Sequence, residues 1–150
     1  MMGDEFEWHG FAGLSAVALY EMLRFRQAIF IVEQASAYPD LDDHDLRSQH
    51  LLVRRGGELV GYLRVVPWLE EGKVTIGRVA VAVSARRGGL ARRMAHQAIA
   101  EARRLYPEWQ LALSAQTYLA PFYASLGFVV ASKPYDDYGV PHLDMVFGPT

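Results

Sequence analysis

Cysteine is absent from this chain, and no long hydrophobic run occurs in it. The lack of cysteine excludes a disulfide framework, a zinc–thiolate site and a cysteine nucleophile. A membrane-spanning helix needs about 20 predominantly apolar residues in a row, so we expect none here. The first ten residues carry acidic side chains in place of a basic start and an apolar run, which argues against a signal peptide. These absences together predict a cytoplasmic protein that contacts no membrane.

Lysine occurs only at Lys73 and Lys133, although the chain has 15 basic residues against 17 acidic ones and a formal net charge of −2. A protein that wraps a nucleic acid needs a strongly basic domain, so this balance argues against a nucleic-acid partner. The charges are unevenly spread, because acidic side chains crowd residues 40–45 and arginines crowd residues 86–104. Local basic density without overall basicity favours a small anionic ligand.

Length and hydrophobic patterning predict one α/β domain over residues 1–150, with helices packed on a largely antiparallel sheet. Ser15 is a suitable N-cap for an apolar helix, or pair of helices, that ends near Val32. The glycine pair at 56–57 separates two β-rich runs and predicts a hairpin. The remaining predicted elements are strands at 6–8, 74–83, 111–115, 128–131 and 142–147, helices at 90–105 and 118–126, and loops at 36–45 and 132–141.

The most informative segment covers residues 79–93. A buried strand leads into a loop of two arginines and two glycines, and an amphipathic helix starts at once. A helix N-terminus offers unpaired N–H groups and a partial positive charge, while glycines let the backbone approach an anion. The segment therefore predicts a phosphate-binding loop, although it matches neither the dinucleotide-binding glycine pattern nor a P-loop. An ordinary strand-to-helix turn with solvated arginines is the alternative interpretation.

A second segment, Phe122-Tyr123-Ala124-Ser125-Leu126-Gly127-Phe128, follows a short predicted strand. Together the two segments resemble the GNAT superfamily of N-acetyltransferases, in which the first holds the pyrophosphate of acetyl-CoA and the second supplies a tyrosine near the thioester sulfur. Six further motifs are similar to those of the ElaA family of GNAT proteins. They lie at residues 23–34, 38–42, 50–51, 76–79, 115–116 and 139–142.

The resemblance implies the GNAT acyl-CoA N-acyltransferase fold, an α/β (α+β) domain with a mixed, mainly antiparallel central sheet and helices on both faces. It also implies direct transfer of an acetyl group from acetyl-CoA to a primary amine in a ternary complex. The implied co-substrate is acetyl-CoA, no metal is implied, and the acceptor is a small amine or a protein amine. A non-catalytic CoA-binding regulatory module is the alternative, and a homodimer is left open.

By this resemblance the cofactor site has three parts. The loop and the first helical turn hold the pyrophosphate, chiefly through backbone N–H groups. The preceding strand pairs its backbone with the pantetheine arm like an added strand, and a glutamine at the end of the next strand hydrogen-bonds the same arm. The cofactor-binding residues predicted in this way are Val79, Ala80, Val81, Arg86, Arg87, Gly88, Gly89, Leu90, Ala91, Arg92, Gln116 and Phe122.

The implied chemistry needs a base for the amine, whose pKa is near 10.4, and an acid for the leaving thiolate. Tyr123 is the predicted general acid, and a core tyrosine is the alternative interpretation. Glu33 and His142 are both candidate bases, because partial burial raises the pKa of a carboxyl group and histidines titrate near neutral pH. Each also has a structural alternative: Glu33 as an ion-pair partner of Arg26 or Arg78, and His142 as an ordinary strand residue.

The acceptor site is predicted to contain Glu33, Tyr38, Arg78 and His142. Arg78 lies immediately before the cofactor strand, where it can bind an acidic acceptor or brace Glu33. The acidic loop at 40–45 is expected to be solvated, and it would attract cationic amines if it lines the acceptor cleft. Its aspartate spacing fails the calcium-binding EF-hand pattern, so we expect no metal.

Overall fold

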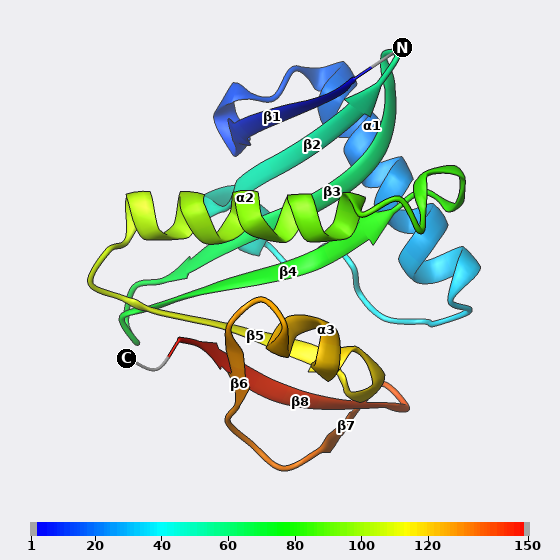
Figure 1. The fold of residues 1–150 in the computed structure, drawn as a ribbon. Helices are drawn as coiled ribbons and strands as arrows, with labels where there is room; N and C mark the ends of the chain where they lie inside the picture. Colours follow the sequence, from blue (N-terminus) through cyan, green and yellow to red (C-terminus); the bar gives the residue numbers. More distant parts are fainter. Residues whose placement is uncertain (1–2, 149–150) are drawn as a thin grey trace.

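A computed structural model describes residues 3–148, which form one eight-stranded sheet with helices on both faces (Figure 1). The strand order is β1-β2-β3-β4-β5-β8-β6, with β7 paired to β8. Among the described strands, β4 and β5 form the one parallel pair, so the predicted mixed, mainly antiparallel sheet is confirmed. The strands are β1 (Asp4–Gly10), β2 (Gln49–Arg55), β3 (Glu58–Trp68), β4 (Lys73–Val81), β5 (Gln110–Gln116), β6 (Phe128–Val130), β7 (Tyr135–Asp137) and β8 (Val140–Phe147).

The helices begin and end largely where local sequence signals place them. The hydroxyl of Ser15 caps the first helix by accepting a hydrogen bond of 3.0 Å from the N–H of Ala18. This helix does not run on unchanged to Val32, because it switches to π-helical hydrogen bonding over its last seven residues. The longer helical elements are α1 (Ala16–Arg26), the π-helical segment (Gln27–Glu33), α2 (Leu90–Leu105) and α3 (Ala120–Ala124), and short 3₁₀ helices lie at Phe11–Gly13, His44–Arg47, Val83–Ala85 and Thr117–Leu119.

Two neighbouring residues of β2 show how both faces of the sheet are covered. Leu51 belongs to the larger core together with Met94 of α2, whereas Leu52 packs in a second cluster with Met22 of α1. Successive side chains of a strand point to opposite faces, so α1 and α2 lie on opposite faces of the sheet. Figure 1 shows α2 crossing in front of β3.

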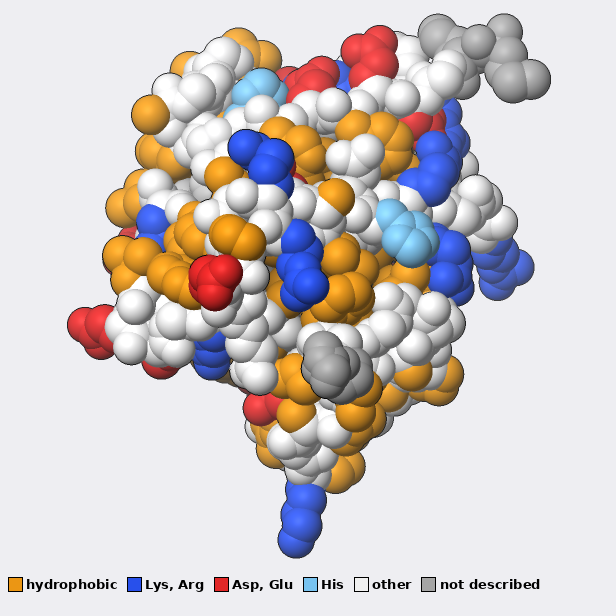
Figure 2. Space-filling model, turned by 60° about the vertical axis from the view of Figure 1, so that its left-hand side comes forward, with side chains coloured by type: hydrophobic (Ala, Val, Ile, Leu, Met, Phe, Trp, Pro, Cys, Tyr) orange, Lys and Arg blue, Asp and Glu red, His pale blue; other side chains and the backbone are white. Residues whose placement is uncertain are grey.

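Basic side chains are dispersed over the molecule. On the face shown in Figure 2 they lie among hydrophobic and polar side chains and do not form one continuous stripe. Several arginines cover aromatic rings: the guanidinium carbon of Arg47 lies 4.9 Å from the ring centre of Trp68, and that of Arg103 lies 5.4 Å from that of Phe147. The guanidinium groups of these two arginines therefore make cation–π contacts with the aromatic rings.

Contrary to the prediction of a solvated acidic loop, three of its four aspartates are paired with arginines, and only Asp43 is exposed. Three aspartates and three arginines alternate in a closed ring of ion pairs, in which each charge contacts two of the opposite sign. In order around this ring, which we call the Arg–Asp ring, the residues are Arg26, Asp45, Arg64, Asp42, Arg78 and Asp40, with N–O distances from 2.6 to 3.2 Å. The arginines come from α1, β3 and β4, so the ring fastens the loop to all three elements.

A further correction concerns the segment predicted as a polar loop at 132–141. Part of this segment forms β7, which pairs antiparallel with β8 so that Tyr135 lies opposite His142. All three residues of β7 are exposed, so the segment has no hydrophobic alternation from which a strand can be predicted.

Candidate functional site

The sheet opens between its two central strands. β4 and β5 pair only from Lys73 to Ile76 and from Gln110 to Leu113. Beyond these positions β4 continues to Val81, still paired to β3 on its other side, where Val81 lies opposite Gly61. The second half of β4 therefore keeps one edge of backbone N–H and C=O groups without a strand partner among the described residues. Such an edge can accept an extended, amide-rich chain as an added strand.

A bulge distorts β4 at the start of this open edge. The register places Gly77 opposite Arg64 but Ala80 opposite Tyr62, so two residues of β4, Arg78 and Val79, oppose a single residue of β3. Arg78 has a φ of 53°, which is a left-handed conformation that costs a non-glycine residue about 1–3 kcal/mol. Its side chain belongs to the Arg–Asp ring and also lies over the ring of Tyr38, with 5.2 Å from the guanidinium carbon to the ring centre. These contacts hold the strained residue in place.

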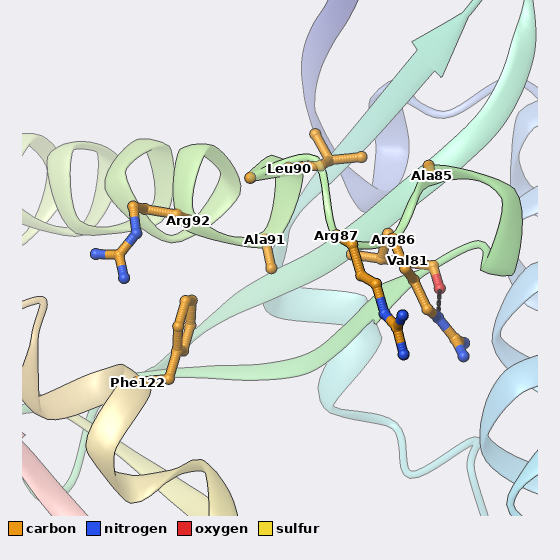
Figure 3. A pocket seen from close by; sticks show the side chains of 9 residues that line it. Val81, Ala85, Arg86, Arg87, Leu90, Ala91, Arg92 and Phe122 are labelled. Carbon is orange, nitrogen blue, oxygen red and sulfur yellow. Dashed lines mark hydrogen bonds between the residues drawn. The ribbon is translucent and has the colours of Figure 1, made fainter.

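An open cavity of about 230 Å³ lies where β4 ends and α2 begins (Figure 3). Figure 3 shows the side chains of Arg86 and Arg87 pointing to the same side from the loop, with Arg92 and Phe122 on the other side of the opening. The residues that line the cavity are Val81, Ala85, Arg86, Arg87, Gly89, Leu90, Ala91, Arg92 and Phe122. Eight of these nine, all except Ala85, are among the predicted cofactor-binding residues.

The backbone at this cavity is arranged to bind an anion. The first intrahelical hydrogen bond of α2 runs from the N–H of Arg93 to the carbonyl of Gly89, so the N–H groups of the first turn have no partner within the helix. Arg87 and Gly89 have φ values of 67° and 81°. A Cβ added at Gly88 or Gly89 would contact nothing within 4 Å, so the backbone faces open space. A group of outward N–H donors at a helix N-terminus is a site for phosphate.

Two of the three arginines that line the cavity are held by protein groups. Arg86 donates from Nε to the carbonyl of Val81 at 2.9 Å and from both terminal nitrogens to the carboxylate of Glu33 at 2.7 and 2.9 Å. Arg92 donates to the hydroxyl of Ser125 at 3.1 Å. Arg87 is exposed and has no ion-pair partner within residues 3–148, so its charge is available to a ligand.

Glu33 has neither the environment nor the partners that the sequence predicts. Its side chain is exposed, and the hydrogen bonds from Arg86 lower the pKa of its carboxyl group. The predicted partners Arg26 and Arg78 belong to the Arg–Asp ring. The prediction of partial burial was wrong because the π-helical segment directs its last residue away from the core. A carboxylate with a lowered pKa is a weaker base than an ordinary one.

Tyr123 lies in the larger core, with 8% of its surface exposed. Its ring contacts those of Phe122 and Phe128 edge to face, at centroid distances of 5.1 and 6.0 Å. Burial, together with the neighbouring Tyr118, raises the pKa of Tyr123 to about 12. The hydroxyl group therefore remains protonated throughout the physiological range, as a hydrogen-bond donor must.

The predicted acceptor residues fall into separate contacts. Tyr38 lies under the guanidinium of Arg78 and also contacts Tyr138, with 5.7 Å between the two ring centres. His142 makes other contacts in β8, where its Nδ1 is 2.9 Å from the carbonyl of Val140 and its Nε2 is 4.0 Å from the carboxylate of Asp137. Tyr138 was not among the residues predicted for the site. Its φ of 50° is left-handed and places it in the turn before β8. The glycine that follows it was the sequence signal for this turn.

Four predicted cofactor residues do not line the cavity: Val79, Ala80, Gly88 and Gln116. The side chain of Ala80 is buried beneath Ile29 and Phe30 of the π-helical segment. Gln116 ends β5 and lies opposite His142 of β8, which puts both on the same face of the sheet. Val79 and Ala80 still contribute their backbone to the open edge of β4, which is the part of the site predicted for them.

Within residues 3–148, no helix has the length and apolar character needed to cross a membrane. The same residues contain no group of three or more histidine, aspartate or glutamate side chains placed to hold a metal ion.

Comparison with known proteins gives consistent matches along the whole chain. A family model described as an acetyltransferase (GNAT) domain matches residues 15–148. A UPF0039 protein of Synechocystis sp. is 38% identical over 148 residues, which cover 97% of this chain and 96% of that protein. Protein ElaA of Escherichia coli is 33% identical over 135 residues, covering 88% of each chain.

Solved structures match equally well. The crystal structure of an acyl-CoA N-acyltransferase from Pseudomonas aeruginosa superposes with a TM-score of 0.92 at 34% identity, covering 97% of this chain and all of that one. The crystal structure of Escherichia coli ElaA gives a TM-score of 0.90 at 32% identity, covering 95% of this chain and 99% of that one.

Proposed function

Since this chain belongs to the GNAT family of acetyltransferases, within its ElaA-like group, we propose that it transfers the acetyl group of acetyl-CoA to a primary amine. The observation that carries the proposal is the cavity at the N-terminus of α2, where the N–H groups of the first turn and the side chain of Arg87 face open space beside the open edge of β4.

The donor fits both parts of this opening. The pyrophosphate of CoA is a compact dianion that suits the N–H groups of the first turn of α2. The pantetheine arm is extended and contains amide groups that suit the backbone of residues 77–81. A GNAT family acetyltransferase from Elizabethkingia anophelis, solved with acetyl-CoA bound, shares the fold with a TM-score of 0.63 over 95% of this chain at 15% identity. That structure supports acetyl-CoA as the donor class.

The reaction joins the amine nitrogen to the thioester carbonyl carbon and breaks the carbon–sulfur bond. The ammonium form of the acceptor must first lose a proton, since an alkyl amine with a pKa near 10.4 is almost fully protonated at pH 7. The departing thiolate gains a proton. We assign donation toward the sulfur to Tyr123, because it follows Phe122, which lines the cavity. The raised pKa makes its hydroxyl a weaker acid than an ordinary phenol, so its role is a hydrogen bond to the charge that develops on the sulfur.

For the base, the geometry favours His142 over Glu33. Glu33 is held in a bidentate pair by Arg86, and its pKa is lowered. His142 pairs with no arginine among the described residues, although the carboxylate of Asp137 lies 4.0 Å from its Nε2, and it lies opposite Gln116 at the end of β5. A proton can pass from the acceptor to His142 directly or through one water molecule.

Two measurements test the proposal together. Titration calorimetry with CoA and acetyl-CoA tests the donor, and thiol release from acetyl-CoA in the presence of polyamines, amino acids, aminoglycosides and a lysine peptide tests the transfer. We expect binding of both nucleotides and amine-dependent thiol release. Absence of CoA binding by the folded protein would refute the proposal. Binding without thiol release for any amine would indicate a regulatory CoA-binding module.

A further inference from the structure

Each of the three guanidinium nitrogens of Arg86 donates a hydrogen bond to a protein group. Its Nε donates to the carbonyl of Val81, the last residue of β4, as the dashed line in Figure 3 shows. Its two terminal nitrogens donate to the two oxygens of Glu33. Isolated surface ion pairs contribute little, but a bidentate guanidinium–carboxylate pair with a third bond to the backbone has a defined geometry.

Glu33 itself is fixed by the residues before it. The π-helical segment buries Ile29 and Phe30 against Ala80 of β4, and Tyr38 packs against the same cluster. π-Helical segments are rare and frequently occur at functional sites. The position of the Glu33 carboxylate is therefore set by apolar packing on the cofactor strand, on the side of the opening that carries Tyr38.

The titration behaviour of both groups agrees with this geometry. The hydrogen bonds from Arg86 lower the pKa of Glu33, and those to Glu33 raise the pKa of Arg86. Each partner therefore stabilises the charged form of the other.

We infer that Arg86 and Glu33 are positioning residues that form a brace between the phosphate-binding loop and the π-helical segment. In this arrangement the side chain of Arg86 does not contact phosphate. The pyrophosphate is bound by the N–H groups of the first turn of α2 and by the side chain of Arg87. The brace fixes the position of the loop relative to the open edge of β4. The inference rests on the proposed function for the identity of the ligand, and it replaces the direct roles that the sequence suggests for Arg86 and Glu33.

A charge swap tests the brace. Arg86→Glu and Glu33→Arg should each raise the Kd of CoA on the order of tenfold, since each breaks a bidentate charged pair and puts like charges together. The double variant Glu33→Arg/Arg86→Glu restores the pair in reverse, so its Kd should return to within about threefold of the wild type. Both side chains are partly exposed, at 39% and 38%, so the swap requires no repacking.

The outcome that would overturn the brace is a double variant that binds CoA as weakly as Arg86→Glu, because the carboxylate introduced at position 86 would then be repelling a phosphate. Unchanged Kd values in both single variants would overturn it as well. Arg87→Glu is the matched control: it should weaken CoA binding, and adding Glu33→Arg should not restore it. Far-ultraviolet circular dichroism confirms that each variant is folded.

A second readout separates the brace from the proposed function. If the wild type fails to bind CoA, the proposed function fails, but the brace is still tested by amide hydrogen exchange in residues 82–92. Exchange in this loop should be faster in each single variant and return to the wild-type rate in the double variant. Equal exchange in all four proteins would refute the brace.

Discussion

The protonation of Glu33 is set by a partner that lies far from it in the sequence. Glu33 ends an apolar helical segment, and this local sequence suggests burial and a raised pKa. Its actual partner, Arg86, lies in a distant loop, and the pair lowers the pKa of Glu33. Tyr123, by contrast, lies on the short helix that its local sequence predicts. A residue's place is thus predictable from neighbours in sequence, but its protonation depends on partners that only the fold brings close.

The substitution Glu33→Gln distinguishes whether Glu33 acts as a general base or as a positioning residue in the brace. The substitution keeps the shape of the side chain and removes its charge, so we expect the KM for acetyl-CoA to rise about threefold and kcat to stay within about twofold. Loss of a general base would instead lower kcat by about 10²–10⁴. Steady-state kinetics with both substrates varied measures the two constants separately, and a collapse of kcat with an unchanged KM would contradict the expectation.

Tyr123→Phe removes the proposed proton donor and keeps the aromatic ring. We expect turnover to fall about a hundredfold, which is the usual scale of acid catalysis, while the Kd of CoA stays unchanged. Thiol release and calorimetry provide the two measurements. Tyr118→Phe is the matched control, because Tyr118 is an exposed tyrosine in the neighbouring turn. Wild-type turnover in Tyr123→Phe would exclude this tyrosine from the chemistry.

At the scale of elements, the helices and most strands were predictable from the sequence, but the Arg–Asp ring was not. The glycine pair between two β-rich runs indicates the hairpin of β2 and β3, and the amphipathic periodicity of α2 lies within a short window of sequence. The ring joins one loop to α1, β3 and β4. Its arginines lie far apart in the chain, so no local pattern indicates that the aspartates are paired rather than solvated.

The Arg–Asp ring should make a large contribution to stability where it is most buried. Arg26 is fully buried and Asp45 nearly so, and removing one partner of a buried ion pair leaves an uncompensated charge. We expect Asp45→Asn to lower the free energy of unfolding by about 3 kcal/mol, measured by urea denaturation. Asp43→Asn is the control, because Asp43 is exposed and its left-handed φ of 64° is tolerated by asparagine. Equal losses in the two variants would contradict this expectation.

For the whole molecule, the family was readable from the sequence because the loop and the tyrosine motif are each contiguous. The acceptor was not, since the segments proposed to form its walls meet only in the fold. Tyr38 and Tyr138 illustrate this: they are in contact but lie far apart in the chain. The Arg–Asp ring also neutralises the acidic loop that the sequence suggests for attracting cationic amines, so the local charge of residues 40–45 does not indicate the acceptor.

Stability should fall on acidification in two stages. Burial lowers the pKa of His50, so below about pH 6.5 the unfolded chain binds a proton that the folded chain does not. Hydrogen bonds from Arg55 lower the pKa of Asp4 to about 2. Burial alone would raise the pKa of Asp42 and Asp45, but their arginine partners outweigh it and lower both. The stabilisation by these aspartates is complete above about pH 3.9 and is lost as the pH falls further.

Thermal unfolding between pH 8 and pH 3 measures both stages. Each proton taken up only by the unfolded chain contributes a slope of up to about 1.4 kcal/mol per pH unit. His50→Gln should remove the first stage and leave the second. A midpoint that stays constant down to pH 4 would show that His50 does not contribute in this way.

Guanidinium groups supply every cation of the Arg–Asp ring and of the brace. A guanidinium keeps its proton at any physiological pH and does not attack a thioester. Alkylamine side chains are confined to Lys73 and Lys133, and Lys73 lies over the ring of Trp68 at the opposite end of β4 from the cavity. Under the proposed function, the acyl donor would thus lie far from the ammonium group of Lys73, and the side chains that line the cavity would offer it no alkylamine to acylate.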